Sequence, residues 1–169
     1  MSNRGRKYGS YTRSHSRLRS LHSASFVELQ RSFPSQVQVI SPFVDQLMRF
    51  ILHFRPTDGS EIDIETTLRE ALASAVIHGN RENPSKRVFV ECRCHTNGEI
   101  SITVQDEGTG FDIGGVPDPT APESRLFNHG RGIYLMTTLM DEVVFEKNGA
   151  VVHMRKKPNL GPVALKKAE

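Results

Sequence analysis

Three short groups of residues in this chain have types and spacing that could bind a phosphorylated ligand. The first is Asp106-x-Gly108-x-Gly110, which directly follows an alternating apolar segment. A carboxylate at a strand end can accept a hydrogen bond from an amine, and glycines let the backbone approach a ligand or adopt positive φ. The segment lacks the Gly-Lys-Ser/Thr of a Walker loop, and a long loop follows it where a dinucleotide-binding fingerprint has a helix.

The second group is Glu70, Ser74 and His78, which are spaced four residues apart. Apolar residues recurring at helical spacing predict a helix over residues 62–78, which would place the three side chains on one face. A carboxylate, a hydroxyl and an imidazole in a column could serve a nucleotide site. Taken alone, the same column is also typical of a solvated helix face.

The third group is Gly130-Arg131-Gly132, at the start of a helix expected over residues 132–140. Free amides at a helix N-terminus suit phosphate, and small residues allow its close approach. Arg125 and Arg131 could add positive charge. The alternative is that the glycines merely let a loop enter a helix.

The elements that must position these groups follow from periodicity and turn residues. Two hairpins are expected around Asn97-Gly98 and Asn148-Gly149. Ser41-Pro42 has the residue types that open a helix. Because few strands are separated by crossover helices, the order favours an α+β fold: a two-layer α/β sandwich with a mixed, mostly antiparallel sheet and helices on one face. The expected elements are a strand over 26–40, helices over 43–54, 62–78 and 132–140, and strands over 88–94, 100–104, 143–145 and 151–154.

Charge divides the 169-residue chain into an arm and a domain. The first 20 residues contain six basic residues and no acid, whereas the remainder has 16 basic against 19 acidic residues. We therefore expect a disordered basic arm over 1–24, one ligand-binding domain over 25–157 and a loose tail over 158–169. Such an arm could contact nucleic acid, but we expect a solvated extension and no direct nucleic-acid binding.

The remaining composition points to a cytoplasmic protein with no membrane segment. No apolar run reaches membrane-spanning length. Cys92 and Cys94 lie on one face of a predicted strand, with no second pair of ligands to complete a metal site. We expect both to be buried, reduced thiols.

The order of the three groups resembles the GHKL ATPase/kinase superfamily, and more closely the bacterial anti-sigma-factor serine kinases and related histidine-kinase-like ATPases. Residues 70–80 resemble the N box of that family, residues 106–112 its G1 box and residues 130–132 its G2 box. The likeness covers roughly residues 28–156, with the motifs in the expected order.

The resemblance implies a Bergerat-type fold that binds ATP and Mg²⁺. Glu70 would be the general base that takes a proton from a substrate Ser or Thr, and Asp106 would bind the adenine amine. Gly108 and Gly110 would let the chain pass the base. Under a lid over 112–129, the phosphates would lie against Gly130, Arg131 and Gly132. The implied partners are a sigma factor and an antagonist protein, and the implied assembly is a homodimer.

The chain departs from the family pattern at two places. Ser74 stands where the family has the Asn that holds Mg²⁺, and a hydroxyl is a poorer ligand than an amide oxygen. His78 or Asn80 could assist. The last strand also lacks the usual Thr. Ser74 motivates one alternative, a nucleotide-dependent partner-binding protein without phosphotransfer. A separate alternative is a detached histidine-kinase catalytic domain, which would need a partner in trans.

Overall fold

The central hairpin forms as its residue pattern predicts. The computed structural model describes residues 25–55, 57–110 and 128–159, and within them β2 (Arg87–His95) and β3 (Ile100–Asp106) pair in antiparallel register. Gly98 in the connecting turn has φ +84°. Cys92 and Cys94 face the core of the domain as buried, free thiols, as expected.

Three further strands complete one sheet. They are β1 (Phe26–Pro34), β4 (Glu142–Glu146) and β5 (Val151–Lys156), and the strand order is β1-β2-β3-β5-β4. All four pairings among the described residues are antiparallel. The predicted fold class is therefore confirmed, with a sheet that is antiparallel throughout this part of the chain.

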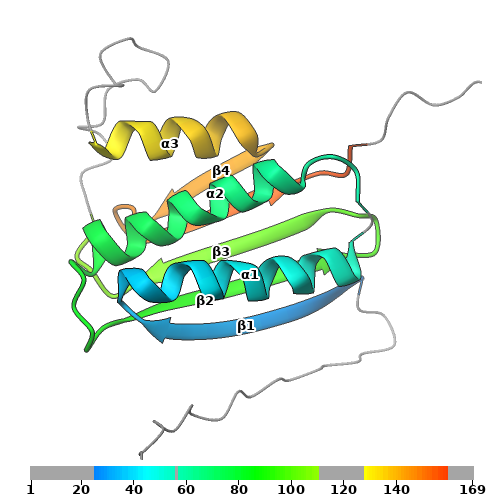
Figure 1. Ribbon diagram of the computed structural model, residues 1–169. Helices are drawn as coiled ribbons and strands as arrows, with labels where there is room; N and C mark the ends of the chain where they lie inside the picture. The colour runs from blue at the N-terminus through cyan, green and yellow to red at the C-terminus, as the bar shows by residue number, and fades with distance from the viewer. Residues whose placement is uncertain (1–24, 56, 111–127, 160–169) are drawn as a thin grey trace, which may run out of the picture.

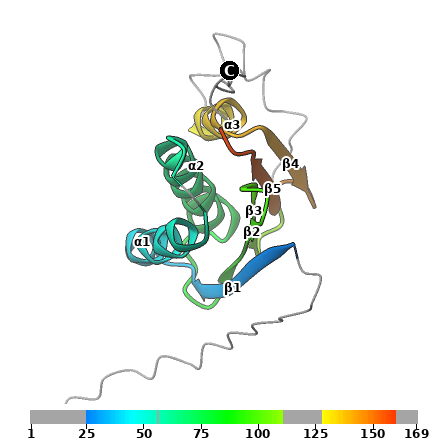
Figure 2. The same cartoon turned by 90° about the vertical axis from the view of Figure 1, so that its right-hand side faces the viewer.

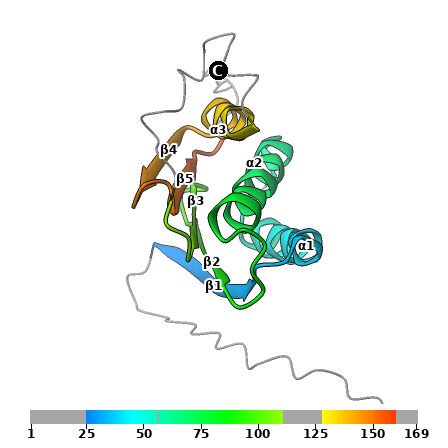
Figure 3. The same cartoon turned by 90° about the vertical axis from the view of Figure 1, so that its left-hand side faces the viewer.

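Helices α1 (Val37–Phe54), α2 (Glu61–Ala73) and α3 (Asn128–Leu139) lie on one face of the sheet (Figures 1 and 2). A short π-helix, η1 (Ser74–Gly79), continues α2. Viewed from the other side, α2 again lies between α1 and α3 (Figure 3). Leu47, Ile51, Leu68 and Leu72 are at most 1% exposed, so the apolar stripes of α1 and α2 form the core against the sheet.

Two predicted helix starts are wrong by several residues. The strand expected over 26–40 ends at Pro34, and α1 begins at Val37 with Pro42 inside it. Proline removes one helical hydrogen bond, here to the Gln38 carbonyl, and Gln38 is exposed so that water can replace it. Burial of Ile40 and Phe43 on the same face outweighs that loss.

The helix expected from Gly132 begins at Asn128 instead. A Cβ atom at Gly132 would lie 3.1 Å from Oε2 of Glu70 on α2. The glycine therefore lies inside the helix where α3 approaches α2 closely, and the need for this approach is a tertiary one that the local pattern does not carry.

A buried ion pair ties the end of α1 to the start of α2. Arg55 is 4% exposed, donates to the Gly98 carbonyl and bonds Asp58 at 2.8 Å. Burial raises the pKa of Asp58, but hydrogen bonds from the Ser60 hydroxyl and from the backbone N–H groups of Asn159 and Ser60, with the Arg55 charge, together lower it to about 2.

No helix among the described residues is long and apolar enough to cross a membrane. The predicted basic arm over 1–24 lies outside the described residues. Residues 160–169 of the predicted tail also lie outside them.

Candidate functional site

Asp106 is the last residue of β3 and is 7% exposed. Its Oδ1 accepts the N–H of Gly108 at 2.7 Å, and its Oδ2 accepts no hydrogen bond in the part of the chain that the structure describes. Burial raises the pKa of Asp106, while the Gly108 N–H and the charge of Lys86 partly offset that effect. One carboxylate oxygen is thus held in place and the other can accept a donor.

Two glycines allow the backbone to close around Asp106. A Cβ atom at Gly79 would lie 2.6 Å from Oδ1 of Asp106, and one at Gly108 would lie 2.6 Å from the carbonyl carbon of Gly79. Carbon atoms in contact are normally 3.5–4.0 Å apart, so no side chain fits at either position without movement. The end of η1, the end of β3 and the loop after it are therefore in direct contact.

Gly110 continues this loop with φ +77°, in the left-handed region that favours glycine. A Cβ atom there would lie 2.8 Å from the carbonyl oxygen of Lys147 in the β4–β5 turn. The structure thus gives Gly108 and Gly110 a packing role, whatever ligand they also accommodate.

Asn80 is a site residue whose role was not recognised from the sequence. It is 1% exposed, its Oδ1 accepts the Glu107 N–H and its Nδ2 donates to the Arg87 carbonyl, both at 2.9 Å. Both polar atoms of the amide are engaged in holding neighbouring backbone, and the expectation that Asn80 could assist Mg²⁺ stays a prediction that would use the second lone pair of Oδ1. From the sequence, Asn80 was considered only as a possible aid to Mg²⁺ binding, because its partners Arg87 and Glu107 lie on other segments of the chain.

The predicted column of Glu70, Ser74 and His78 is divided between two kinds of helix. The α-helix ends at Ala73, and the Asn80 N–H bonds the Ala75 carbonyl five residues back. Such π-turns occur frequently at functional sites. Ser74 is half-buried and lines a cleft, whereas His78 is exposed and does not line it.

The cleft lies where α2, β3, β5 and α3 meet. Its walls are mostly apolar, with Asp106 and Ser74 as the polar groups, and its volume is about 10 Å³. That volume holds about one water molecule, so a purine ring enters only if the residues that line the cleft move apart. The residues that line it are Ala71, Ser74, Ala75, Val104, Asp106, Met136, Phe145, Gly149 and Val152.

Glu70 and the predicted phosphate-binding turn lie against each other. The Glu70 side chain is half-buried and approaches Gly132, as described above. Gly130 and Arg131 lie in the first turn of α3, where backbone N–H groups have no acceptor within the helix. Arg131 is exposed, and Arg125 lies outside the described residues.

These groups fit an adenine nucleotide and give partial support for a metal. Apolar walls with a carboxylate oxygen that is uncommitted among the described residues suit a base that bears an amine, and the first turn of α3 suits phosphate. Glu70 and Ser74 lie four residues apart, and both carry side-chain oxygens, which are the ligand atoms that Mg²⁺ prefers. The described residues contain no group of three or more His, Cys, Asp or Glu side chains able to hold a metal ion, so Mg²⁺ would depend largely on phosphate oxygens.

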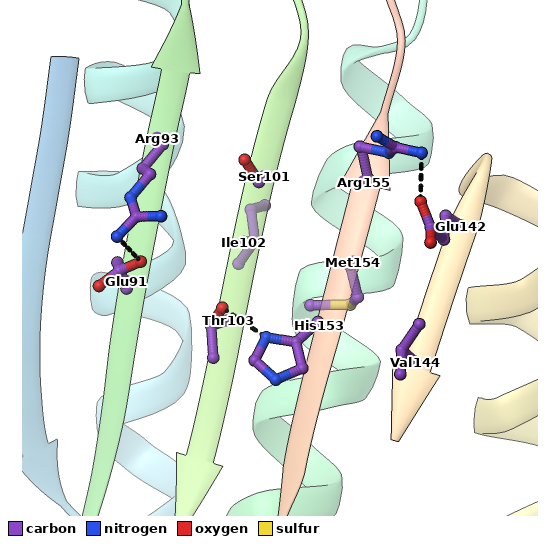
Figure 4. A pocket seen from close by; sticks show the side chains of 10 residues that line it. All are labelled: Glu91, Arg93, Ser101, Ile102, Thr103, Glu142, Val144, His153, Met154 and Arg155. Atoms are coloured by element: carbon purple, nitrogen blue, oxygen red, sulfur yellow. Dashed lines mark hydrogen bonds and ion pairs between the residues drawn. The ribbon is translucent and has the colours of Figure 1, made fainter. Parts of the chain in front are cut away.

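A larger groove of about 240 Å³ lies on the opposite, helix-free face of the sheet (Figure 4). Its charged side chains are already paired: Arg93 with Glu91, and Arg155 with Glu142. His153 Nδ1 lies 3.0 Å from the Thr103 hydroxyl. Since no arginine there is left to bind phosphate, we assign the site to the cleft beside Asp106.

Comparison with known proteins gives an independent view of the same residues. Residues 33–156 match the histidine kinase-like ATPase domain. The chain is 33% identical to an anti-sigma F factor of Heyndrickxia coagulans, over 63% of this chain and 76% of that protein. It is 38% identical to an anti-sigma F factor of Clostridium perfringens strain SM101, over 65% of this chain and 81% of that protein.

Proposed function

Because the chain belongs to the histidine kinase-like ATPase family, within the group of anti-sigma F factors, we propose that it binds ATP in the cleft beside Asp106 and phosphorylates a serine or threonine of an antagonist protein. The observation that carries the proposal is that Asp106 and Ser74 line one cleft with Met136 of α3, while Glu70 of α2 lies next to Gly132 of the same helix.

Each group has a defined task in this proposal. Asp106 Oδ2 would accept an N–H from the amine of the base, and backbone N–H groups at the start of α3 would bind phosphate oxygens. ATP would supply the phosphoryl group, whose bond to ADP breaks as the substrate hydroxyl oxygen bonds to phosphorus, and Mg²⁺ would neutralise phosphate charge. Glu70 takes the proton from the substrate hydroxyl, a step that requires a carboxylate within hydrogen-bond reach of that hydroxyl.

The partner proteins follow from the names of the relatives. We propose that this chain binds a sigma factor, and that phosphorylation of the antagonist controls when the sigma factor is held. Such a protein acts in the cytoplasm, where sigma factors meet RNA polymerase. Co-elution of the purified chain with sigma factors from its own genome tests this part, and failure to bind any of them would contradict it.

A second function is favoured by Ser74: nucleotide-dependent partner binding without phosphotransfer. A serine hydroxyl has a shorter reach than the amide oxygen of the usual Asn, so the metal would be held more weakly. Partner affinity would then depend on whether nucleotide is bound, with no chemical step.

Calorimetric titration with ATP, in Mg²⁺ and then in EDTA, distinguishes the two functions when combined with a phosphotransfer assay on the antagonist. Mg²⁺-strengthened binding with transfer supports the kinase. Mg²⁺-independent binding without transfer, together with a large gain of transfer in Ser74→Asn, supports the second function. No binding in either buffer refutes both.

Glu70→Gln tests the general base. We expect transfer to fall about 100-fold or more while ATP affinity changes little, because general-base catalysis contributes about 10²–10⁴-fold. Glu65→Gln is the matched control, since Glu65 lies on the same helix and bonds Arg69 at 2.8 Å instead of facing α3. Equal activity of Glu70→Gln and Glu65→Gln would remove Glu70 from the mechanism.

A further inference from the structure

We propose that Asn80 is a positioning residue for base recognition, because it joins the end of η1 to the loop after β3 and so holds Asp106 where its carboxylate selects a purine with an exocyclic amine. The inference rests on the proposed binding of ATP beside Asp106. It adds a specificity-determining role for a residue that would not itself touch the nucleotide.

The position of Asn80 marks the end of the β2–β3 ladder. The last paired residues are Val88 and Asp106. Beyond this pair, the side-chain amide of Asn80 bridges the segments that continue β2 and β3. It accepts the Glu107 N–H and donates to the Arg87 carbonyl, while Oε2 of Glu107 accepts the Arg87 N–H at 2.6 Å. These bonds form a closed ring of three residues.

The ring of hydrogen bonds constrains Asp106 from two directions, through the backbone that follows it and through the glycine that packs on its side chain. Glu107 is the next residue after Asp106, and Gly79, directly before Asn80, packs on the Asp106 carboxyl group. The backbone N–H of Asn80 is also fixed, through its bond to the Ala75 carbonyl at 2.8 Å. Without the Asn80 amide, the Glu107–Gly108 segment loses its hydrogen bond to the end of η1 and keeps only the packing of Gly108 on Gly79, so the Asp106 carboxylate is held less firmly.

Only an amide side chain of this length satisfies both neighbours. Asn offers an acceptor and a donor from one planar group, whereas Asp offers acceptors alone and Ala offers neither. Asn80 is 1% exposed, so water has little access to replace the missing partner. The conformation of the Asp106 loop therefore depends on the residue type at position 80.

A purely structural role predicts a different result from a positioning role. If Asn80 only stabilises the fold, its loss reduces the amount of active protein but leaves the choice of base unchanged. If it positions Asp106, its loss weakens recognition of the amine specifically. The ratio of two nucleotide affinities measures this choice and does not depend on the fraction of folded protein.

The test compares the dissociation constants of ATP and of purine riboside triphosphate, which lacks the exocyclic amine. We expect the wild-type chain to bind ATP about 10- to 100-fold more tightly, as a hydrogen bond to a charged group implies. Asn80→Ala should reduce this preference to about threefold or less. Asn80→Asp, which keeps an acceptor for the Glu107 N–H, should give an intermediate value.

Two variants serve as controls. Asp106→Asn should abolish the preference, because it changes the group that receives the amine. Asn83→Ala should retain it, because Asn83 lies in the same turn but is exposed, and its side chain accepts only the Ser85 N–H among the described residues.

The outcomes separate this inference from the function on which it rests. Absence of ATP binding by the wild type refutes the proposed function, and binding without preference refutes the role of Asp106. A preference that Asp106→Asn removes but Asn80→Ala retains refutes the role of Asn80 alone. Loss of folding in both Asn80 variants also counts against the proposal, since Asn80 would then be needed for the fold itself.

Discussion

Replacement of Gly108 by alanine should disable base recognition through a steric clash. Gly108 has no positive φ, so the added methyl group fails for lack of space and not for backbone strain. The new Cβ atom would lie 2.6 Å from the carbonyl carbon of Gly79 and 2.7 Å from Oδ1 of Asp106. The carbon–carbon separation is about 1 Å shorter than a normal carbon contact, and the separation from Oδ1 is also too short for contact without movement.

The expected magnitude follows from what must move. Both neighbours belong to packed segments, and overpacking of this kind costs typically 1–3 kcal/mol. The shift also weakens the hydrogen bond from the Gly108 N–H to Asp106, a bond to a charged group worth roughly 1.5–3 kcal/mol. We expect the free energy of unfolding to fall by about 3 kcal/mol and ATP affinity to fall about 10- to 100-fold.

Urea denaturation and calorimetric titration with ATP measure the two effects separately. Gly59→Ala is the control, because Gly59 has φ +87° but nothing within 4 Å of the position its Cβ would take. That variant should lose about 1–2 kcal/mol of stability through left-handed backbone strain and bind ATP normally. If Gly108→Ala binds ATP as tightly as the wild type, the contact between the loop and η1 does not position the base-binding carboxylate.

Two further predictions concern the pH dependence of buried carboxylates. Burial raises the pKa of Asp106, so its ionisation costs stability as the pH rises from the ordinary value of 3.8 through the folded-state pKa. We compare the free energies of unfolding of Asp106→Asn and the wild type by urea denaturation between pH 3 and pH 7. As the pH rises, the wild type should lose stability relative to the variant. A difference that stays constant with pH would contradict this. The pKa of Asp58 is lowered to about 2, so its contribution is present above pH 3.8 and is lost as the pH falls toward 2. Asp58→Asn should be less stable than the wild type at pH 7 and equal to it near pH 2, and a gap that persists at pH 2 would mean that the charge of Asp58 is not what stabilises this loop.

Much of the sheet could be predicted from the sequence because its signals are local. Alternation of Val88, Val90, Cys92 and Cys94 marks one buried face of a strand, and Asn-Gly pairs mark the two turns. The order of the three motifs was also sufficient to identify the family. These features depend on residues within a few positions of one another, so they can be read without knowing what packs against them.

The helix boundaries could not be predicted in the same way. Ser41-Pro42 has the residue types of a helix start, yet α1 passes through it because Ile40 and Phe43 gain more from burial than the helix loses at Pro42. Likewise, Gly132 reads as the first residue of a helix but lies inside α3, where a small residue lets that helix approach Glu70. Local propensity is a weak preference that tertiary packing overrides.

The sequence by itself determined which side chains are available for chemistry: a carboxylate after a strand, a carboxylate on a helix and glycines before another helix. Only the tertiary structure decided how they are held. Asn80 meets Arg87 and Glu107, which lie 7 and 27 residues further along the chain. Gly79 meets Asp106 only because η1 is docked on the end of β3. Such contacts depend on how the elements pack together, and no periodicity within one element encodes them.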